Sequence, residues 1–185
     1  MRLGITRLLL TVCVVLIAMM GGFGTEVVPA GVNTSDNGKC SIHVPNWNLN
    51  GCPLAGADLA YLDLTGSLMI DTDLRGANMS AVYMVNANMC RANLSGAYLG
   101  IAVLDYAVLC HANLRGAYLG GASLWNANLK EADLSGADLS DANLRYAVMG
   151  RTNLDQVIWN NTTCPDGSNS DAPDGDGFTC FYNLE

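Results

Sequence analysis

The chain has 185 residues, half of them hydrophobic, and its 17 acidic side chains outnumber nine basic ones to give a formal net charge of −8. An acidic balance favours solubility and argues against binding to nucleic acids or to anionic membrane surfaces. The only histidines are His43 and His111, and neither lies in a nucleophile–base arrangement or at the spacing of metal ligands. We therefore expect no catalytic residues, no cofactor and no metal ion.

Residues 1–30 have the pattern of a secretory signal peptide. Arg2 and Arg7 precede an apolar run over residues 8–20, which is shorter than the roughly 20 residues that a membrane-spanning helix needs. The small residues at Gly24 and Ala30 are the two candidate cleavage points, and an uncleaved membrane anchor is the alternative. We expect a secreted or periplasmic protein that is free of the membrane after cleavage.

Residues 31–51 lie between the signal peptide and a regular repeat, and we interpret them as an N-terminal cap. The ends of a repeat protein expose an apolar cross-section that must be covered. Trp47 is bulky enough to act as a lid at this end, and Trp159 occupies the corresponding place at the other.

Between residues 52 and 159 an apolar side chain returns at every fifth position. Leu or Met occupies all twenty-one of these positions from Leu54 to Leu154, and the residue two places earlier is Ala without exception from Ala87 to Ala147. A short fixed period of this kind is typical of repeat architectures.

Neither a helix nor a continuous strand can keep this five-residue period on one side. A helix advances about 100° per residue, so five residues rotate the apolar stripe by roughly 140°. A strand alternates faces, so an odd period turns every second Leu outward. The pattern predicts short extended segments that point Ala and Leu inward, each followed by a corner.

A second period, of twenty residues, indicates how many sides each coil of the chain has. Glycine recurs every twenty residues in one slot of the repeat, at Gly56, Gly76, Gly96, Gly116 and Gly136. Four pentapeptides per coil would stack these glycines along one corner, where the ability of Gly to adopt a positive φ suits a tight turn. The repeat then predicts about five coils, separated by about 4.8 Å.

The repeat resembles the pentapeptide-repeat family, whose motif is A(D/N)LXX. The motif is clearest at Ala57-Asp58-Leu59, Ala77-Asn78-Met79, Ala92-Asn93-Leu94-Ser95-Gly96 and Ala132-Asp133-Leu134-Ser135-Gly136. The resemblance implies an all-β fold: a right-handed quadrilateral parallel β-helix, or solenoid, of four pentapeptides per coil.

Six cysteines remain after removal of the signal peptide, namely Cys40, Cys52, Cys90, Cys110, Cys164 and Cys180. An even number in an exported protein favours disulfides. Cys90 and Cys110 share one outward slot twenty residues apart, so coil spacing places their Cα atoms within disulfide range. We predict this bridge and two others, Cys40 with Cys52 and Cys164 with Cys180. For Cys90 and Cys110, free thiols or a metal site with His111 are the alternatives.

The outward slot before each central Leu is usually Asp or Asn, whose side chain is expected to bond to backbone groups of the next turn. Apolar or aromatic residues replace it at several positions, among them Tyr83, Tyr98, Val103, Val108 and Tyr118. We regard these five as a candidate interaction patch. The alternative is that the repeat simply tolerates apolar side chains in this slot.

Residues 160–185 form a polar tail bounded by Cys164 and Cys180. Asp171, Asp174 and Asp176 resemble part of a calcium loop, but Phe178 falls where an EF-hand needs another oxygen ligand. We expect a turn-rich, disulfide-closed cap here, with calcium binding left open.

The resemblance implies two classes of function. The first is an exported, non-catalytic structural or interaction module that binds another protein or surface, with a homodimer left open. The second is a DNA mimic that inhibits gyrase or topoisomerase. Ten acids and six bases between residues 52 and 159 give a net charge of only −4, whereas duplex DNA of the same height carries roughly 14 charges. The sequence therefore favours the first class.

Overall fold

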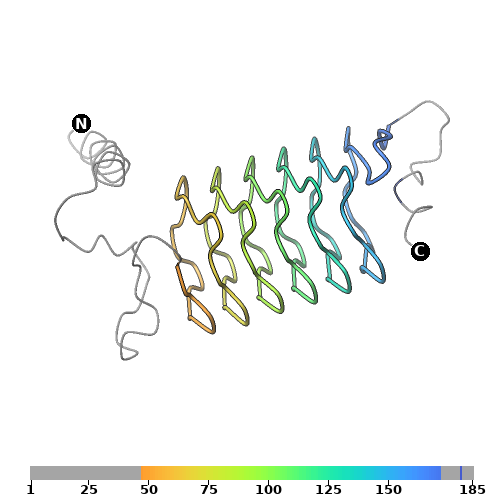
Figure 1. Cartoon of the computed structure of the whole chain (residues 1–185). Coiled ribbons are helices and arrows are strands. Elements are labelled where there is room, and N and C mark those ends of the chain that lie inside the picture. Colours follow the sequence, from red (N-terminus) through yellow and green to blue (C-terminus); the bar gives the residue numbers. More distant parts are fainter. Residues whose placement is uncertain (1–46, 172–179, 181–185) are drawn as a thin grey trace, which may run out of the picture.

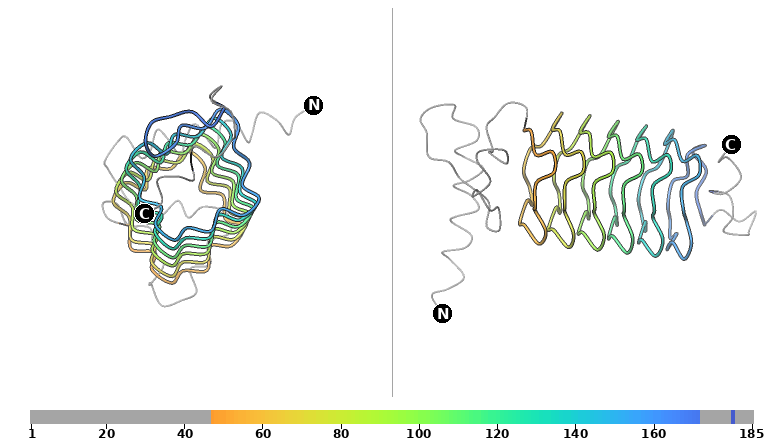
Figure 2. Two further views of the ribbon diagram at one scale, coloured as in Figure 1. Left: turned by 90° about the vertical axis from the view of Figure 1, so that its right-hand side faces the viewer. Right: turned by 90° about the horizontal axis from the view of Figure 1, so that it is seen from below.

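The computed structural model describes residues 47–171 and Cys180. The described residues form a column of stacked coils (Figure 1), and a view along the column shows the coils lying in register (Figure 2). The predicted signal peptide, Cys40, His43, Asp174 and Asp176 lie outside the described residues.

Parallel β-bridges join each coil to the next, always between residues twenty apart. They run from Asn48 paired with Leu68 to Asn143 paired with Thr163. Twenty residues are four pentapeptides, so each coil has four short sides. The β-structure in the described part of the chain consists of isolated bridges, and besides the parallel ones an antiparallel bridge pairs Thr163 with Asn169.

The bridges arrange the outward slot before each central Leu or Met into four columns along the coil stack. Column 1 contains Asn48, Leu68, Asn88, Val108, Asn128 and Val148, and column 2 contains Pro53, Asp73, Asn93, Asn113, Asp133 and Asn153. Column 3 contains Asp58, Asn78, Tyr98, Tyr118, Asp138 and Ile158, and column 4 contains Asp63, Tyr83, Val103, Ser123, Asn143 and Thr163.

Backbone hydrogen bonds explain why the five-residue unit repeats. The amide of Leu104 donates to the carbonyl of Ser123 in the next coil at 2.7 Å, and the amide of Val103 donates to Val82 in the previous coil at 2.9 Å. At the corner the amide of Ala107 donates back to Leu104 at 3.0 Å. This i to i+3 bond, with a positive φ at Tyr106, is the pattern of a type II turn.

Every fifth residue from Gly51 to Asn161 has a positive φ. The predicted glycine column from Gly56 to Gly136 is part of this set, with φ of 60–69°. Fifteen of the positions are not glycine, however, and they include Tyr61 and the β-branched Ile101. Left-handed backbone is unusual for such residues, so the ladder of coil-to-coil bonds imposes the corner conformation even where the residue does not favour it.

The core is the predicted ladder of Leu and Met. All twenty-one side chains from Leu54 to Leu154 are buried, as is every Ala from Ala87 to Ala147. Trp47 is buried at the N-terminal end of this core, and Trp159 packs against it with partial burial.

Ser67 provides a test of how the core treats polar groups. Its hydroxyl is buried without a hydrogen-bond partner in a slot that is usually Ala. Because an unpaired buried hydroxyl is costly, we expect Ser67→Ala to raise the free energy of unfolding by about 1 kcal/mol. Thr72 occupies the same slot, but its Oγ1 donates to the carbonyl of Leu49 at 2.7 Å. Thr72→Ala should therefore lower the free energy of unfolding. Urea unfolding of both variants measures the two effects. Destabilisation by Ser67→Ala would contradict this account.

Candidate interaction surface

The Asp and Asn side chains of the outward slot hold the corners, as predicted. Each carboxylate or amide oxygen accepts a hydrogen bond from the amide two residues later. The bond is 3.0 Å from Thr65 to Asp63, 3.1 Å from Arg115 to Asn113 and 2.9 Å from Ser140 to Asp138. These acids recur because they shape the turn, and their number alone does not indicate a reaction centre.

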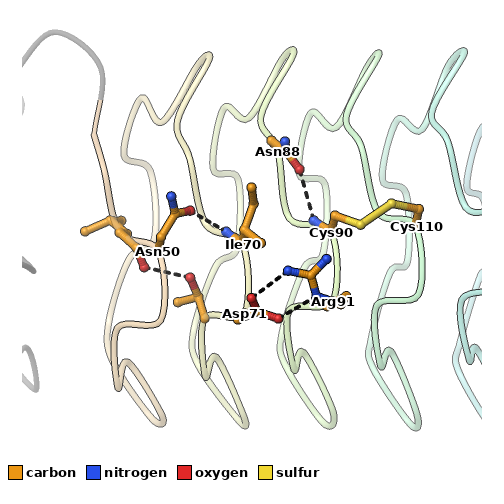
Figure 3. A network of polar contacts seen from close by, with 9 residues as sticks. Asn50, Ile70, Asp71, Asn88, Cys90, Arg91 and Cys110 are labelled. Carbon is orange, nitrogen blue, oxygen red and sulfur yellow. Dashed lines mark hydrogen bonds and ion pairs between the residues drawn. A yellow bond between two sulfur atoms is a disulfide. The ribbon is translucent and has the colours of Figure 1, made fainter.

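The corner that joins columns 1 and 2 is polar and cross-linked (Figure 3). Arg91 donates two hydrogen bonds to Asp71, at 2.8 and 2.7 Å, and Asn50 accepts one from the amide of Ile70 at 2.7 Å. Along the same corner a disulfide joins Cys90 to Cys110, with their Cα atoms 4.7 Å apart.

Two disulfide bonds join cysteines that the structure describes. Besides the bond between Cys90 and Cys110, Cys164 is bonded to Cys180 with a Cα separation of 5.0 Å. Cys52 is also disulfide-bonded, and its predicted partner Cys40 lies outside the described residues. These bonds are consistent with the expected pairs, and the complete set of three stays a prediction.

Three of the described carboxyl groups have a lowered pKa, and hydrogen bonds within the repeat explain each shift. The hydrogen bonds from Arg91 lower the pKa of Asp71, and those from Arg75 lower the pKa of Asp73. Partial burial raises the pKa of Asp133, but the bond from the amide of Ser135 and weaker interactions outweigh it, so the net pKa is lowered. All three groups are stabilised as carboxylates, which suits a surface ion pair and not an acid catalyst.

The charged corner continues beyond the disulfide. His111 Nδ1 lies 3.3 Å from Glu131, which Arg151 also approaches at 3.6 Å. Among the described residues, no group of three or more His, Cys, Asp or Glu side chains could hold a metal ion. No helix in this part of the chain is long and apolar enough to cross a membrane.

Tyr98 and Tyr118 are bridged neighbours in column 3 and are 57% and 47% exposed. The ring of Tyr118 lies across Gly100 and Gly120. A Cβ at Gly100 would come 2.8 Å from Tyr118 Cε1, and one at Gly120 would come 2.6 Å from its hydroxyl oxygen. These two glycines have no positive φ, so they are needed for the space that the ring occupies.

Gly100→Ala should therefore displace the ring of Tyr118. The matched control is Gly150→Ala, in the same slot of the repeat, where a Cβ would meet nothing within 4 Å. We expect Gly100→Ala to alter the Tyr118 ring resonances in NMR spectra. We also expect its free energy of unfolding to be about 1 kcal/mol below that of Gly150→Ala, because the added methyl group overpacks the contact. Unchanged Tyr118 resonances in Gly100→Ala would show that the ring does not rest on this glycine.

A second aromatic group lies on the corner that follows column 4. The rings of Tyr106 and Trp125 meet edge to face with centroids 4.8 Å apart, and Trp125 meets Tyr146 at 5.9 Å. Asp105 accepts hydrogen bonds from the hydroxyl of Ser123 and from the amide of Trp125. Because its neighbours surround it on two sides, Trp125 has a fixed place in this row.

The structure brings together most of the predicted patch and adds to it. Tyr98 and Tyr118 lie in column 3, and Tyr83 and Val103 lie in the adjacent column 4. Val108 lies apart in column 1, between Asn88 and Asn128. Four further residues complete what we call the aromatic surface, which consists of Tyr83, Tyr98, Ile101, Val103, Tyr106, Tyr118, Trp125 and Tyr146.

The added residues occupy corner slots, whereas the predicted patch was drawn from the outward slot alone. Tyr106 and Tyr146 are forty residues apart and so share a corner two coils apart, and Ile101 is the most exposed large hydrophobic residue described, at 64%. Reading every slot at a spacing of twenty would have revealed them.

A closed stack of four-sided coils joined by parallel bridges defines the protein as a β-helix. Residues 48–158 match the model for pentapeptide repeats in eight copies. The chain belongs to the pentapeptide-repeat family, whose members are right-handed β-helices.

Solved structures of this family resemble the chain. HetL of the cyanobacterium Nostoc sp. strain PCC 7120, which is involved in the regulation of heterocyst differentiation, is 29% identical over 66% of this chain and 63% of its own length, with a TM-score of 0.49. A pentapeptide repeat protein of the Arabidopsis thaliana thylakoid lumen is 25% identical over 54% of this chain and 69% of its own, with a TM-score of 0.52. The chain thus spans less than two thirds of HetL. No curated protein matches the chain in sequence.

Proposed function

We propose that the protein is an exported, non-catalytic interaction module that binds another protein through the outside of its β-helix. The observation that carries the proposal is the exposure of Tyr83, Tyr98 and Tyr118 on neighbouring columns, together with the corner aromatic row. Monomeric proteins rarely expose large contiguous apolar patches without a partner. The repeat supplies a rigid support, and the Asp and Asn residues are occupied in shaping corners.

Export is supported by two independent features. The signal pattern in residues 1–30 predicts secretion, and the bonds Cys90–Cys110 and Cys164–Cys180 are of the kind that persists in oxidising compartments. The thylakoid lumen of the related plant protein is likewise outside the cytosol and stroma in which proteins are made. We propose a secreted or periplasmic location, with residues 31–51 and 160–185 as caps around about five coils.

An intact mass of the native protein, measured in each cell fraction with and without reduction, tests this proposal. We expect the exported fraction to contain a chain that has lost residues 1–24 or 1–30 and that gains two hydrogens per disulfide on reduction. Chemical cross-linking in the same fraction should attach the chain to another protein. A full-length, reduced protein in the cytoplasm would overturn the proposal and make gyrase inhibition the next activity to assay.

A further inference from the structure

Charge is divided unevenly between two halves of the coil stack. One half comprises columns 3 and 4 with the corner that follows each, and it carries the aromatic surface. Between residues 48 and 161 this half contains five acids and one base, namely Asp58, Asp63, Asp105, Asp138, Asp141 and Arg145. The other half contains five acids and five bases, namely Asp71, Asp73, Glu131, Asp133, Asp155, Arg75, Arg91, Arg115, Lys130 and Arg151.

The second half neutralises itself locally. Arg75 pairs with Asp73 at 2.7 Å, and Arg91 pairs with Asp71 at the same distance. Such pairing leaves little net field to attract an acidic surface. The half of one copy that contains columns 1 and 2 is therefore a poor electrostatic match for the acidic aromatic half of another copy. Charge complementarity favours a different protein as the partner.

Two acids of the aromatic half lie next to its rings. Asp63 is bridged to Tyr83, and Asp138 is bridged to Tyr118. No described basic side chain forms an ion pair with any of the five acids on this half. Exposed rings beside carboxylates can receive Arg or Lys both as a cation over the ring and as an ion-pair partner.

The rings are also held in place before any partner arrives. Gly100 and Gly120 provide the floor on which Tyr118 rests, and Trp125 is fixed between Tyr106 and Tyr146. Rigid aromatic side chains lose little conformational entropy on binding, which is why they so often anchor interfaces.

We propose that the aromatic surface is the docking site for a protein segment that presents arginine or lysine together with apolar side chains. This inference rests on the proposed function and specifies its surface and the chemistry of its partner. The apolar side chains cover the rings, while the cations meet the carboxylates at the edges of the surface.

Two fluorescent synthetic peptides of equal length test the proposal by anisotropy with the purified, disulfide-bonded protein. One alternates arginine with leucine, and the other alternates glutamate with leucine. We expect only the arginine peptide to bind, and we expect Tyr83→Ala with Tyr118→Ala to weaken binding by about tenfold or more. The matched control, Leu68→Ala with Val148→Ala, removes two exposed apolar side chains in column 1, on the other half of the coil stack. It should leave binding unchanged.

A second pair of variants separates local charge from net charge. Asp63→Lys with Asp138→Lys reverses two acids beside the rings and should also weaken binding about tenfold. Asp133→Lys with Asp155→Lys changes the net charge equally on the other half and should have little effect. Circular dichroism verifies that each variant is folded.

Equal binding of the two peptides, no binding of the arginine peptide, or equal losses in test and control variants would overturn the inference. So would a dimer, measured by light scattering, that dissociates in Tyr83→Ala with Tyr118→Ala, because the occupant would then be a second copy. Cross-linking to an exported protein that survives in that variant would leave the proposed function standing and reject this surface. Failure of all cross-linking would reject the function itself.

Discussion

Leu104→Ala is expected to lower the free energy of unfolding by about 2–5 kcal/mol, because it leaves a cavity that the rigid coil cannot close. Leu104 is 1% exposed in the middle of the ladder. Its backbone is held to Ser123 in the next coil, which limits how far neighbouring coils can collapse into the space. Urea unfolding followed by circular dichroism measures the loss.

Leu104→Met is the matched control for this cavity. Met fills the same inward slot at Met84 and Met89, where it is fully buried, so the fold accepts its shape. A swap that conserves volume usually costs less than about 1.5 kcal/mol. If Leu104→Ala cost no more than Leu104→Met, the coil would be far more deformable than its hydrogen-bond ladder indicates.

Removal of the central disulfide by Cys90→Ala with Cys110→Ala is expected to lower the free energy of unfolding by about 3 kcal/mol. The bond closes a loop with a sequence separation of 20, and a cross-link of this size restricts the unfolded chain by about that amount in the chain-entropy model. Because the coils beside it remain bonded by their backbones, we expect the folded spectrum to be unchanged while the urea midpoint falls.

Ser95→Ala with Arg115→Ala provides the comparison for the disulfide. These residues occupy the same slots, also twenty apart, on the next corner of the same coils, where Arg115 is exposed and Ser95 is half-buried. Surface substitutions usually change stability by less than about 0.5 kcal/mol. Equal effects of the two double variants would mean that the cross-link contributes nothing beyond its side chains.

The core could be predicted from the sequence because one signal repeats without interruption. From Leu54 to Leu154 each fifth residue is apolar, and the fold has one simple way to bury them all. The twenty-residue spacing of Gly56 and Gly76 likewise indicated the number of sides. The corner itself was less predictable, since Tyr61 and Ile101 adopt the same positive φ as the glycines.

The aromatic surface was only partly predictable, because its residues come from different slots of the repeat. Tyr98 and Tyr118 share a slot and are twenty residues apart, so spacing alone is enough to place them side by side. Trp125 and Tyr146 occupy two different corner slots, so their contact depends on side-chain reach between adjacent coils. The space that Tyr118 needs above Gly100 is a property of ring direction, which no periodicity encodes.

The two periods also constrain how the gene can change in length. Loss or gain of one pentapeptide would keep every Leu in phase with the core, yet it would rotate all later residues by a quarter turn. If the change fell between Tyr98 and Cys110, Tyr118 would leave the column of Tyr98, and Cys110 would leave the side of Cys90. Only an insertion or deletion of a whole coil preserves both the interior and the exterior. The core therefore tolerates changes in length by multiples of five residues, whereas the arrangement of the surface side chains tolerates only multiples of twenty.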